Sequence, residues 1–178
     1  MSVASLVKHA GISINMLITI LSFVNTGFMD VSLARHLEQE HGLSIRTIGG
    51  LFFLTSAVYV VTNQASAFLI HKHSSSARPL VLAGFTCSAL MFLLSGPMFP
   101  LSFEETTPVL LVKQVLFGLS IGPQLVGSFF EGTAETKRAG FPSGEATSAA
   151  FSALFTTSMT LGYSVCLFLT LKRLTQPF

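Results

Sequence analysis

Charge is scarce in this sequence. Only 10% of the 178 residues are Asp, Glu, Lys or Arg, 50% are hydrophobic, and the mean hydropathy is +0.67. An average soluble domain carries about a quarter charged residues. So few charges could not cover the surface of a soluble protein of this length, which excludes an ordinary soluble domain and indicates a membrane protein.

Residue sets that carry familiar catalytic or metal chemistry are also lacking. Cys87 and Cys166 both fall inside apolar segments, so neither a disulfide framework nor a metal-binding spacing is indicated. His71 and His73 do not share a helical face and have no carboxylate nearby, which is typical of a solvated loop. There is no phosphate-binding glycine loop and no Ser, His and Asp set. Nothing favours an enzyme, a cofactor or a nucleic-acid partner.

Five stretches are nearly free of charge, and each is long enough to cross a bilayer. A helix needs roughly 18 to 20 residues to span about 30 Å of hydrocarbon, and it satisfies its own backbone hydrogen bonds there. We therefore predict an all-α integral membrane protein, one domain over residues 1–178. Its predicted spans are residues 10–34, 47–70, 79–100, 107–131 and 146–171.

The first stretch has an alternative interpretation as a signal peptide, because Lys8 precedes an apolar segment. We favour a membrane span, since the stretch is too long, ends in no small-x-small cleavage pattern and is followed by segments of the same character. Lys and Arg divide equally between the two sides of the predicted bundle, so charge alone assigns no orientation.

Polar residues recur three, four or seven positions apart inside three of the spans, which places them along helical stripes that we call polar seams. The first span carries Asn15, Thr19, Ser22, Thr26 and Asp30. The second carries Thr55, Tyr59, Thr62 and Ser66, with Asn63 and Gln64 beside them. The fourth carries Lys113, Ser120, Gln124 and Glu131, with Gly118 and Gly122 one turn apart and Pro123 expected to interrupt the backbone.

Two interpretations apply to these seams. In the first, small and hydroxylated residues let helices pack closely and hydrogen-bond across their interfaces, at about 0.6 to 2 kcal/mol per bond. We favour this interpretation for Ser22, Thr26, Ser66 and the Gly118/Gly122 pair.

The charged members of the seams differ from the hydroxylated ones. A carboxylate at the bilayer centre costs at least about 3 kcal/mol and usually faces a cavity or an ion path, so we favour function for Asp30 and Glu131. The alternative is that both lie at the headgroup level. Lys113 is expected to extend its ammonium group toward the interface from a helix end.

The order of the segments resembles a known family. The stretches "GFMDVSLARHL", "GLFFLTSAVYVVTNQASAFLIHK", "LVLAGFTCSALMFLLSGPMFPL" and "LLVKQVLFGLSIGPQLVGSFFEG" are similar to helices seven to ten of the major facilitator superfamily. They are most similar to its vesicular amine and polyamine transporter-like branch, solute carrier family 18. The segment starting "GEATSAAF" falls where the eleventh helix is expected. The resemblance covers about residues 10–171.

The resemblance implies a secondary transporter that exchanges protons for organic cations such as amines or polyamines, in a vesicle or another endomembrane, with the plasma membrane as an open alternative. Asp30 and Glu131 match acidic positions of the seventh and tenth helices. The resemblance also implies a cytoplasmic amino terminus and "HKHSSSARP" loop, and a luminal "SFEETTP" loop. The candidate substrate- and proton-binding residues are Asp30, Glu131, Asn25, Tyr59, Asn63 and Gln124.

The sequence also departs from the family pattern. "HKHSSSAR" lacks the acidic residue that many relatives carry, and "GYSVCLFLT" replaces their Gly-Pro and paired-glycine pattern. The first six helices and the twelfth are not matched, so the five spans offer one wall of the mid-membrane cavity. We expect either a fragment or a chain that needs another transporter half or a second copy. The alternative function is a non-transporting subunit or regulator of a full-length transporter.

Overall fold

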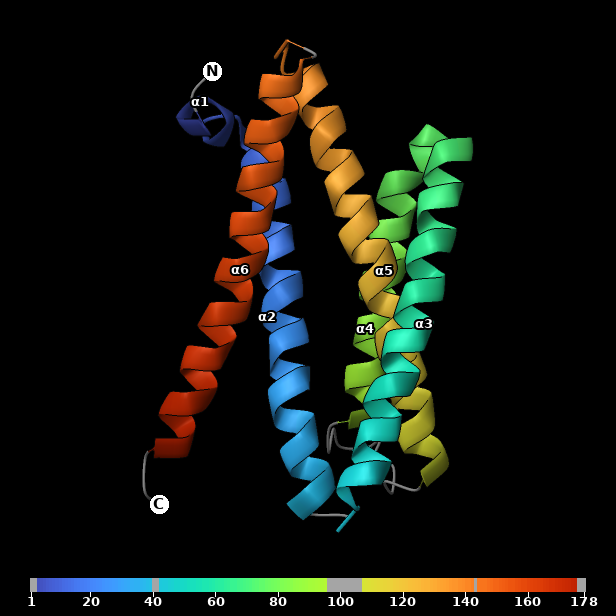
Figure 1. The fold of residues 1–178 in the computed structure, drawn as a ribbon. Helices are drawn as coiled ribbons and strands as arrows, with labels where there is room; N and C mark the ends of the chain where they lie inside the picture. Colours follow the sequence, from blue (N-terminus) through green and yellow to red (C-terminus); the bar gives the residue numbers. More distant parts are fainter. Residues whose placement is uncertain (1–2, 40–41, 96–106, 143, 176–178) are drawn as a thin grey trace. The chain divides into compact units, whose positions relative to one another are not determined.

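The structure is a computed structural model that describes residues 3–39, 42–95, 107–142 and 144–175. Within these residues every regular element is helical (Figure 1). The elements are α1 (Val3–Val7), α2 (Ala10–Gln39), α3 (Ile45–Lys72), the 3-10 turn η1 (Ser74–Ser76), α4 (Ala77–Ser95), α5 (Thr107–Arg138) and α6 (Glu145–Thr175).

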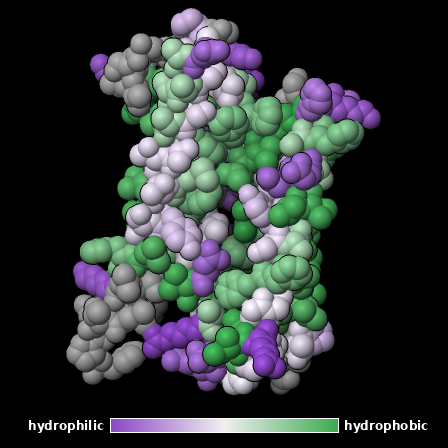
Figure 2. All heavy atoms as spheres, in the orientation of Figure 1, coloured by the Kyte–Doolittle hydropathy of each residue, from purple (hydrophilic) through white to green (hydrophobic). Residues whose placement is uncertain are grey.

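Five of these helices are long and apolar enough to cross a membrane: α2, α3, α4, α5 and the Glu145–Leu169 part of α6. This confirms the prediction of an all-helical, multi-pass membrane protein. Most of the strongly hydrophilic surface in Figure 2 lies toward helix ends, while hydrophobic and neutral residues cover much of the helix middles.

Four helices continue past the predicted ends of their spans, α2 and α5 the furthest. The sequence predicts that the first span ends at residue 34 and the fourth at residue 131, but α2 reaches Gln39 and α5 reaches Arg138. Both extensions are rich in Ala, Leu, Glu, Gln, Lys and Arg, which have high helix propensity in water. The limit of the apolar run therefore marks the expected edge of the membrane rather than the end of the helix. Residues 96–100 of the third predicted span lie outside the described residues.

Local signals explain where several helices begin and end. Ser44 caps α3 by accepting a hydrogen bond from the Thr47 backbone N–H at 3.3 Å. Pro108 lies in the first turn of α5, where a backbone N–H has no partner within the helix, so the N–H that proline lacks is not missed there. At the other end of α5, Gly140 adopts a φ of 78°, the left-handed conformation that glycine takes without steric cost.

The expected interruption at Pro123 is wrong, because α5 continues as one helix through it. Proline removes one backbone hydrogen bond, but membrane helices tolerate this where neighbouring helices hold the segment in place. Pro123 is buried, and its neighbours Gly122 and Gln124 contact α3 and α4 respectively. Packing therefore keeps the helix continuous.

The contacts among the residues divide the chain into two compact units. The sequence, with its short connections between spans, predicts one domain. Unit 1 comprises Met1–His41 and Ser128–Phe178, and unit 2 comprises Gly42–Gly127. The boundary falls inside α5, so both units share one uninterrupted helix. Because this boundary lies within a helix, no linker-like stretch of sequence marks it.

In unit 1, α2 and α6 run parallel and side by side (Figure 1). The Ser158 hydroxyl donates to the Met16 sulfur at 3.3 Å, and a Cβ added at Gly27 would lie 3.1 Å from the Cβ of Cys166. Between these two levels, the Gly162 Cα lies against the Ile20 carbonyl with no space for a side chain. The two helices therefore approach closely because glycine removes the side chains between them.

In unit 2, α5 packs against both α3 and α4 through glycines. A Cβ at Gly118 would lie 2.7 Å from the Thr55 carbonyl oxygen, and one at Gly122 would lie 2.8 Å from the Asn63 backbone nitrogen. On the α4 side, a Cβ at Gly84 would lie 2.8 Å from the Ser120 carbonyl oxygen. This agrees with the packing role predicted for the Gly118/Gly122 pair.

Candidate cation and proton site in unit 1

Asp30 lies two thirds of the way along α2 and is partly buried. The Tyr163 hydroxyl of α6 donates a hydrogen bond to Asp30 Oδ2 at 3.2 Å. The close approach of the two helices makes this contact, because the Gly27 backbone lies beside the Tyr163 ring; a Cβ added at Gly27 would be 3.3 Å from the ring atom Cδ2. A phenol that faces a carboxylate across a glycine contact holds that carboxylate in a defined orientation.

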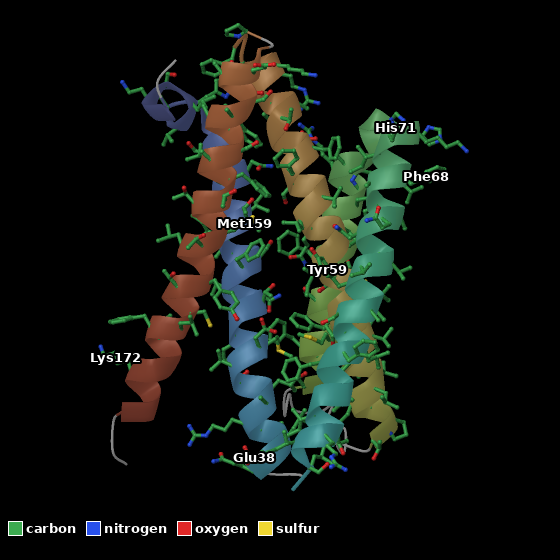
Figure 3. The ribbon with its side chains drawn as sticks, viewed as in Figure 1. Glu38, Tyr59, Phe68, His71, Met159 and Lys172 are labelled. Atoms are coloured by element: carbon green, nitrogen blue, oxygen red, sulfur yellow. The ribbon has the colours of Figure 1, made fainter. Side chains whose placement is uncertain are left out.

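The partner helix also shows where Asp30 lies relative to the apolar run of α6. Tyr163 lies nine residues before Lys172, the first charged residue after the run 146–171. Nine residues correspond to about 13 Å along the helix axis, close to the roughly 15 Å half-thickness of the hydrocarbon core. Lys172 lies near the far end of α6 and Glu38 near the corresponding end of α2 (Figure 3). Asp30 is therefore level with the apolar part of α6 and not with its charged end.

Glu131 has a different environment. Arg138 Nη1 donates to Glu131 Oε1 at 2.9 Å and also to Glu135 Oε1, all within the last turns of α5. Both carboxylates are mostly buried and the guanidinium is half exposed. Glu131 thus already has a counter-charge, and it belongs to an ion-pair cluster at a helix end.

The structure does not bring Asp30 and Glu131 together. Gly132, next to Glu131, contacts Asn15 near the start of α2, whereas Asp30 lies fifteen residues further along the same helix. That separation corresponds to about 22 Å at the rise of an α-helix. The two predicted carboxylates therefore cannot hold one small cation at the same time.

Most hydroxyls of the α2 polar seam bond within their own helix. Thr19 donates to the Asn15 carbonyl, Ser22 to the Ile18 carbonyl and Thr26 to the Ser22 carbonyl, each at 3.0 Å. Such bonds satisfy a hydroxyl without any ligand. The hydroxyls of Ser22 and Thr26 thus bond within α2, whereas the packing interpretation predicts bonds across a helix interface. Asn25 lies on the same helix, partly buried.

Three predicted residues, Tyr59, Asn63 and Gln124, belong to unit 2. The Gln124 amide donates to Ser88 Oγ at 3.0 Å, linking α5 to α4. Tyr59 and Asn63 are partly exposed one turn apart on α3, where Figure 3 marks Tyr59 near mid-helix. Gln124 therefore has a structural partner, and the three residues form a set of their own in unit 2, while Asp30 belongs to unit 1.

Lys113 departs from its expectation. The sequence predicts that it extends toward the interface, but it is only 3% exposed. It lies beside Gln114, whose side-chain carbonyl accepts a hydrogen bond from the Thr55 hydroxyl across the α3/α5 contact. The lysine is buried because α5 is the helix that both α3 and α4 contact in unit 2, a property that its distance from a helix end does not reveal.

Sequence reasoning missed Tyr163, Arg138 and Gln114. Tyr163 is one of only two tyrosines in the chain and lies in a charge-free run, and this was the signal that could have drawn attention to it. Arg138 lies beyond the end of the predicted fourth span, so the span pattern does not include it. Gln114 is next to the seam residue Lys113 and is not part of the seam spacing. Among the described residues no group of three or more His, Cys, Asp or Glu could hold a metal ion.

Comparison of the chain with protein-family models, with curated proteins and with solved structures found no match. Function is therefore inferred from the geometry of unit 1 and from the residues themselves.

Proposed function

We propose that this chain is part of a secondary active transporter that exchanges protons for organic cations, such as amines or polyamines, across an endomembrane. The resemblance of its segments to the carboxy-terminal half of the major facilitator superfamily supports this proposal. So does the parallel pairing of α2 and α6, which places a polar helix seam next to the charge-free run 146–171 of α6. Orientation, with the amino terminus in the cytoplasm, belongs to the same proposal.

One observation carries the proposal: Asp30 is held by Tyr163 at the level of the apolar part of α6. An acidic side chain at such a depth is costly, and acidic residues that are kept there usually line an ion or proton path. Glu131 supports the proposal less, because Arg138 already neutralises it. We therefore assign the exchanging carboxylate to Asp30.

The chemistry follows from the two charge states of one carboxylate. The charged Asp30 accepts the Tyr163 hydrogen bond on Oδ2 and can bind a cation with Oδ1. Protonation removes the negative charge, so the cation loses its counter-ion and leaves. Release of that proton on the other side restores the charged form. Protons and substrate thus compete for the same group, which is the requirement for obligatory exchange.

The test is uptake by proteoliposomes that contain the full chain, with an acidic interior and labelled amine or polyamine outside. We expect accumulation that collapses when the proton gradient is dissipated. Asp30→Asn should lower uptake by at least about tenfold, since the neutral amide supplies neither counter-charge nor exchangeable proton. Glu131→Gln is the matched control and should retain most uptake. Equal uptake by wild type and Asp30→Asn would exclude the assignment.

The separation of Asp30 and Glu131 favours a second candidate, a non-transporting subunit or regulator that associates with a full-length transporter. A subunit or regulator does not bind substrate itself, so its acidic residues have no need to lie close together. Affinity purification from native membranes would distinguish the two. Stoichiometric recovery of a larger transporter, together with no uptake by the chain alone, would favour the subunit.

A further inference from the structure

Near the start of α2, two buried polar side chains have no hydrogen-bond partner among the described residues. Asn15 is 6% exposed and Ser128, on α5, is 2% exposed. The two atoms concerned are Asn15 Oδ1 and Ser128 Oγ, in contrast to the bonded hydroxyls of Thr19, Ser22 and Thr26. Buried polar atoms in native proteins are nearly always satisfied, by protein or by ordered water. These two atoms therefore call for an occupant.

Ser128 and Gly132, the residue that Asn15 Oδ1 approaches, lie on one face of α5. Asn15 Oδ1 is 2.9 Å from the position that a Cβ on Gly132 would take, and Ser128 precedes Gly132 by one helical turn. Positions four apart on a helix lie on the same side, about 6 Å from one another. The Phe151 ring of α6 also contacts Gly132, so α2, α5 and α6 meet here within unit 1.

A weak Cα–H contact from Gly132 is the alternative partner for Asn15 Oδ1, since such contacts are common between close helices. It leaves the Ser128 hydroxyl without a partner. A single small molecule that donates to Asn15 Oδ1 and bonds Ser128 Oγ satisfies both atoms. Water has the required size and donors, and internal waters typically make about three hydrogen bonds to groups that would otherwise be unsatisfied.

We infer that Asn15 and Ser128 bind an internal water molecule where α2, α5 and α6 meet. The amide oxygen accepts one water hydrogen, and the serine hydroxyl bonds the water oxygen or its second hydrogen. Glu135 lies one turn nearer the helix ends, where its Oε2 would be 2.7 Å from a Cβ on Gly11. The water thus lies next to the charged end of α5, from which it can exchange with solvent.

The test is millisecond radiolytic footprinting of the full chain in nanodiscs, with Phe151 as the reporter. Hydroxyl radicals form from water molecules at their binding sites, so a side chain beside an internal water is oxidised despite burial. Phe151 is 2% exposed and contacts Gly132. We expect clear oxidation of Phe151 in the wild type and its loss in Asn15→Leu.

Ser128→Ala, which changes little volume, keeps the test informative if Asn15→Leu does not fold, and it should also lower Phe151 oxidation. Thr19→Val is the matched control, because Thr19 is equally buried but bonds within its own helix; oxidation should be unchanged. The inference is overturned if Phe151 is not oxidised above the unirradiated sample, or if Ser128→Ala leaves its oxidation unchanged. Suppression by ammonium but not by choline would also overturn it, since the occupant would then be an ammonium ion.

Discussion

Both units pack helices through glycine, but they use polar side chains differently. In unit 2, the Thr55 hydroxyl bonds Gln114 and the Gln124 amide bonds Ser88, so polar groups connect one helix to another. In unit 1, Asp30 bonds a phenol at the level of an apolar run, and Asn15 and Ser128 have no partner among the described residues. The difference is one of degree, because unit 2 also has a buried amide oxygen without a partner in the described part of the chain, Asn63 Oδ1, and Tyr163 of unit 1 also bonds across helices. Polarity inside an apolar helix is therefore ambiguous until its partner is known: in unit 2 it mainly connects helices, and in unit 1 we propose that part of it serves a ligand.

Each unit has its own close helix contacts at glycine, and substitution of such a glycine is expected to have the largest effect on stability. Gly162→Ala would place a Cβ against the Ile20 backbone carbonyl, which cannot rotate away, and should destabilise unit 1 by about 3 kcal/mol. We expect the apparent Tm in nanodiscs to fall by roughly 5 to 10 °C. Gly49→Ala is the control, because nothing lies within 4 Å of its Cβ position. Equal Tm values for both variants would show that the α2/α6 contact is looser than these distances require.

Unit 2 cohesion can be tested by Thr55→Val, which keeps the side-chain shape and removes the hydroxyl that bonds Gln114. We expect a loss of about 1 to 2 kcal/mol, because a buried amide oxygen is left without its donor. The double variant Thr55→Val, Gln114→Leu should recover part of this loss, since no buried polar group then lacks a partner. Additive losses measured by thermal unfolding would mean that the two residues do not interact.

The proposed role of Asp30 in cation uptake can be tested by Tyr163→Phe. The ring packing is kept, and only the hydrogen bond to Asp30 is removed. Relative to the wild type, cation uptake should fall by roughly threefold, less than in Asp30→Asn, because the carboxylate survives but loses one orienting bond. If Tyr163→Phe abolished uptake as completely as Asp30→Asn, the phenol would be more than a positioning residue.

The smallest effect is expected for Arg138→Gln. The guanidinium is exposed, so solvent and salt screen its pairs with Glu131 and Glu135. We expect the apparent Tm to change by less than about 2 °C, with a smaller difference still at high salt. A large fall in Tm that does not depend on salt would show that this cluster stabilises the fold as the Thr55–Gln114 hydrogen bond does.

The sequence predicts the helical fold well because charge-free runs report directly on passage through hydrocarbon. It locates helix ends less well, since α5 continues beyond the apolar run to Arg138, where ion pairs and packing support the helix as well as propensity. It also does not predict the burial of Lys113, because burial depends on which helices contact α5.

The candidate site is predictable only in part. The spacing of Asp30 along the α2 seam indicates a polar face, but Tyr163 lies 133 positions away and has no helical phase in common with it. Likewise, Glu131 has the right residue type, while its guanidinium partner lies in a segment that the sequence predicts as a loop. Contacts between distant segments depend on packing that a periodic pattern does not encode.

The parallel pairing of α2 with α6 has a consequence for biosynthesis. Unit 2 is one continuous segment, Gly42–Gly127, and can complete its contacts while the chain is still being made. Helix α2 must wait in the bilayer until α6 leaves the ribosome, because its partner is made after all of unit 2. Substitutions in α6 should therefore leave α2 exposed to membrane quality control, whereas unit 2 would already have escaped it.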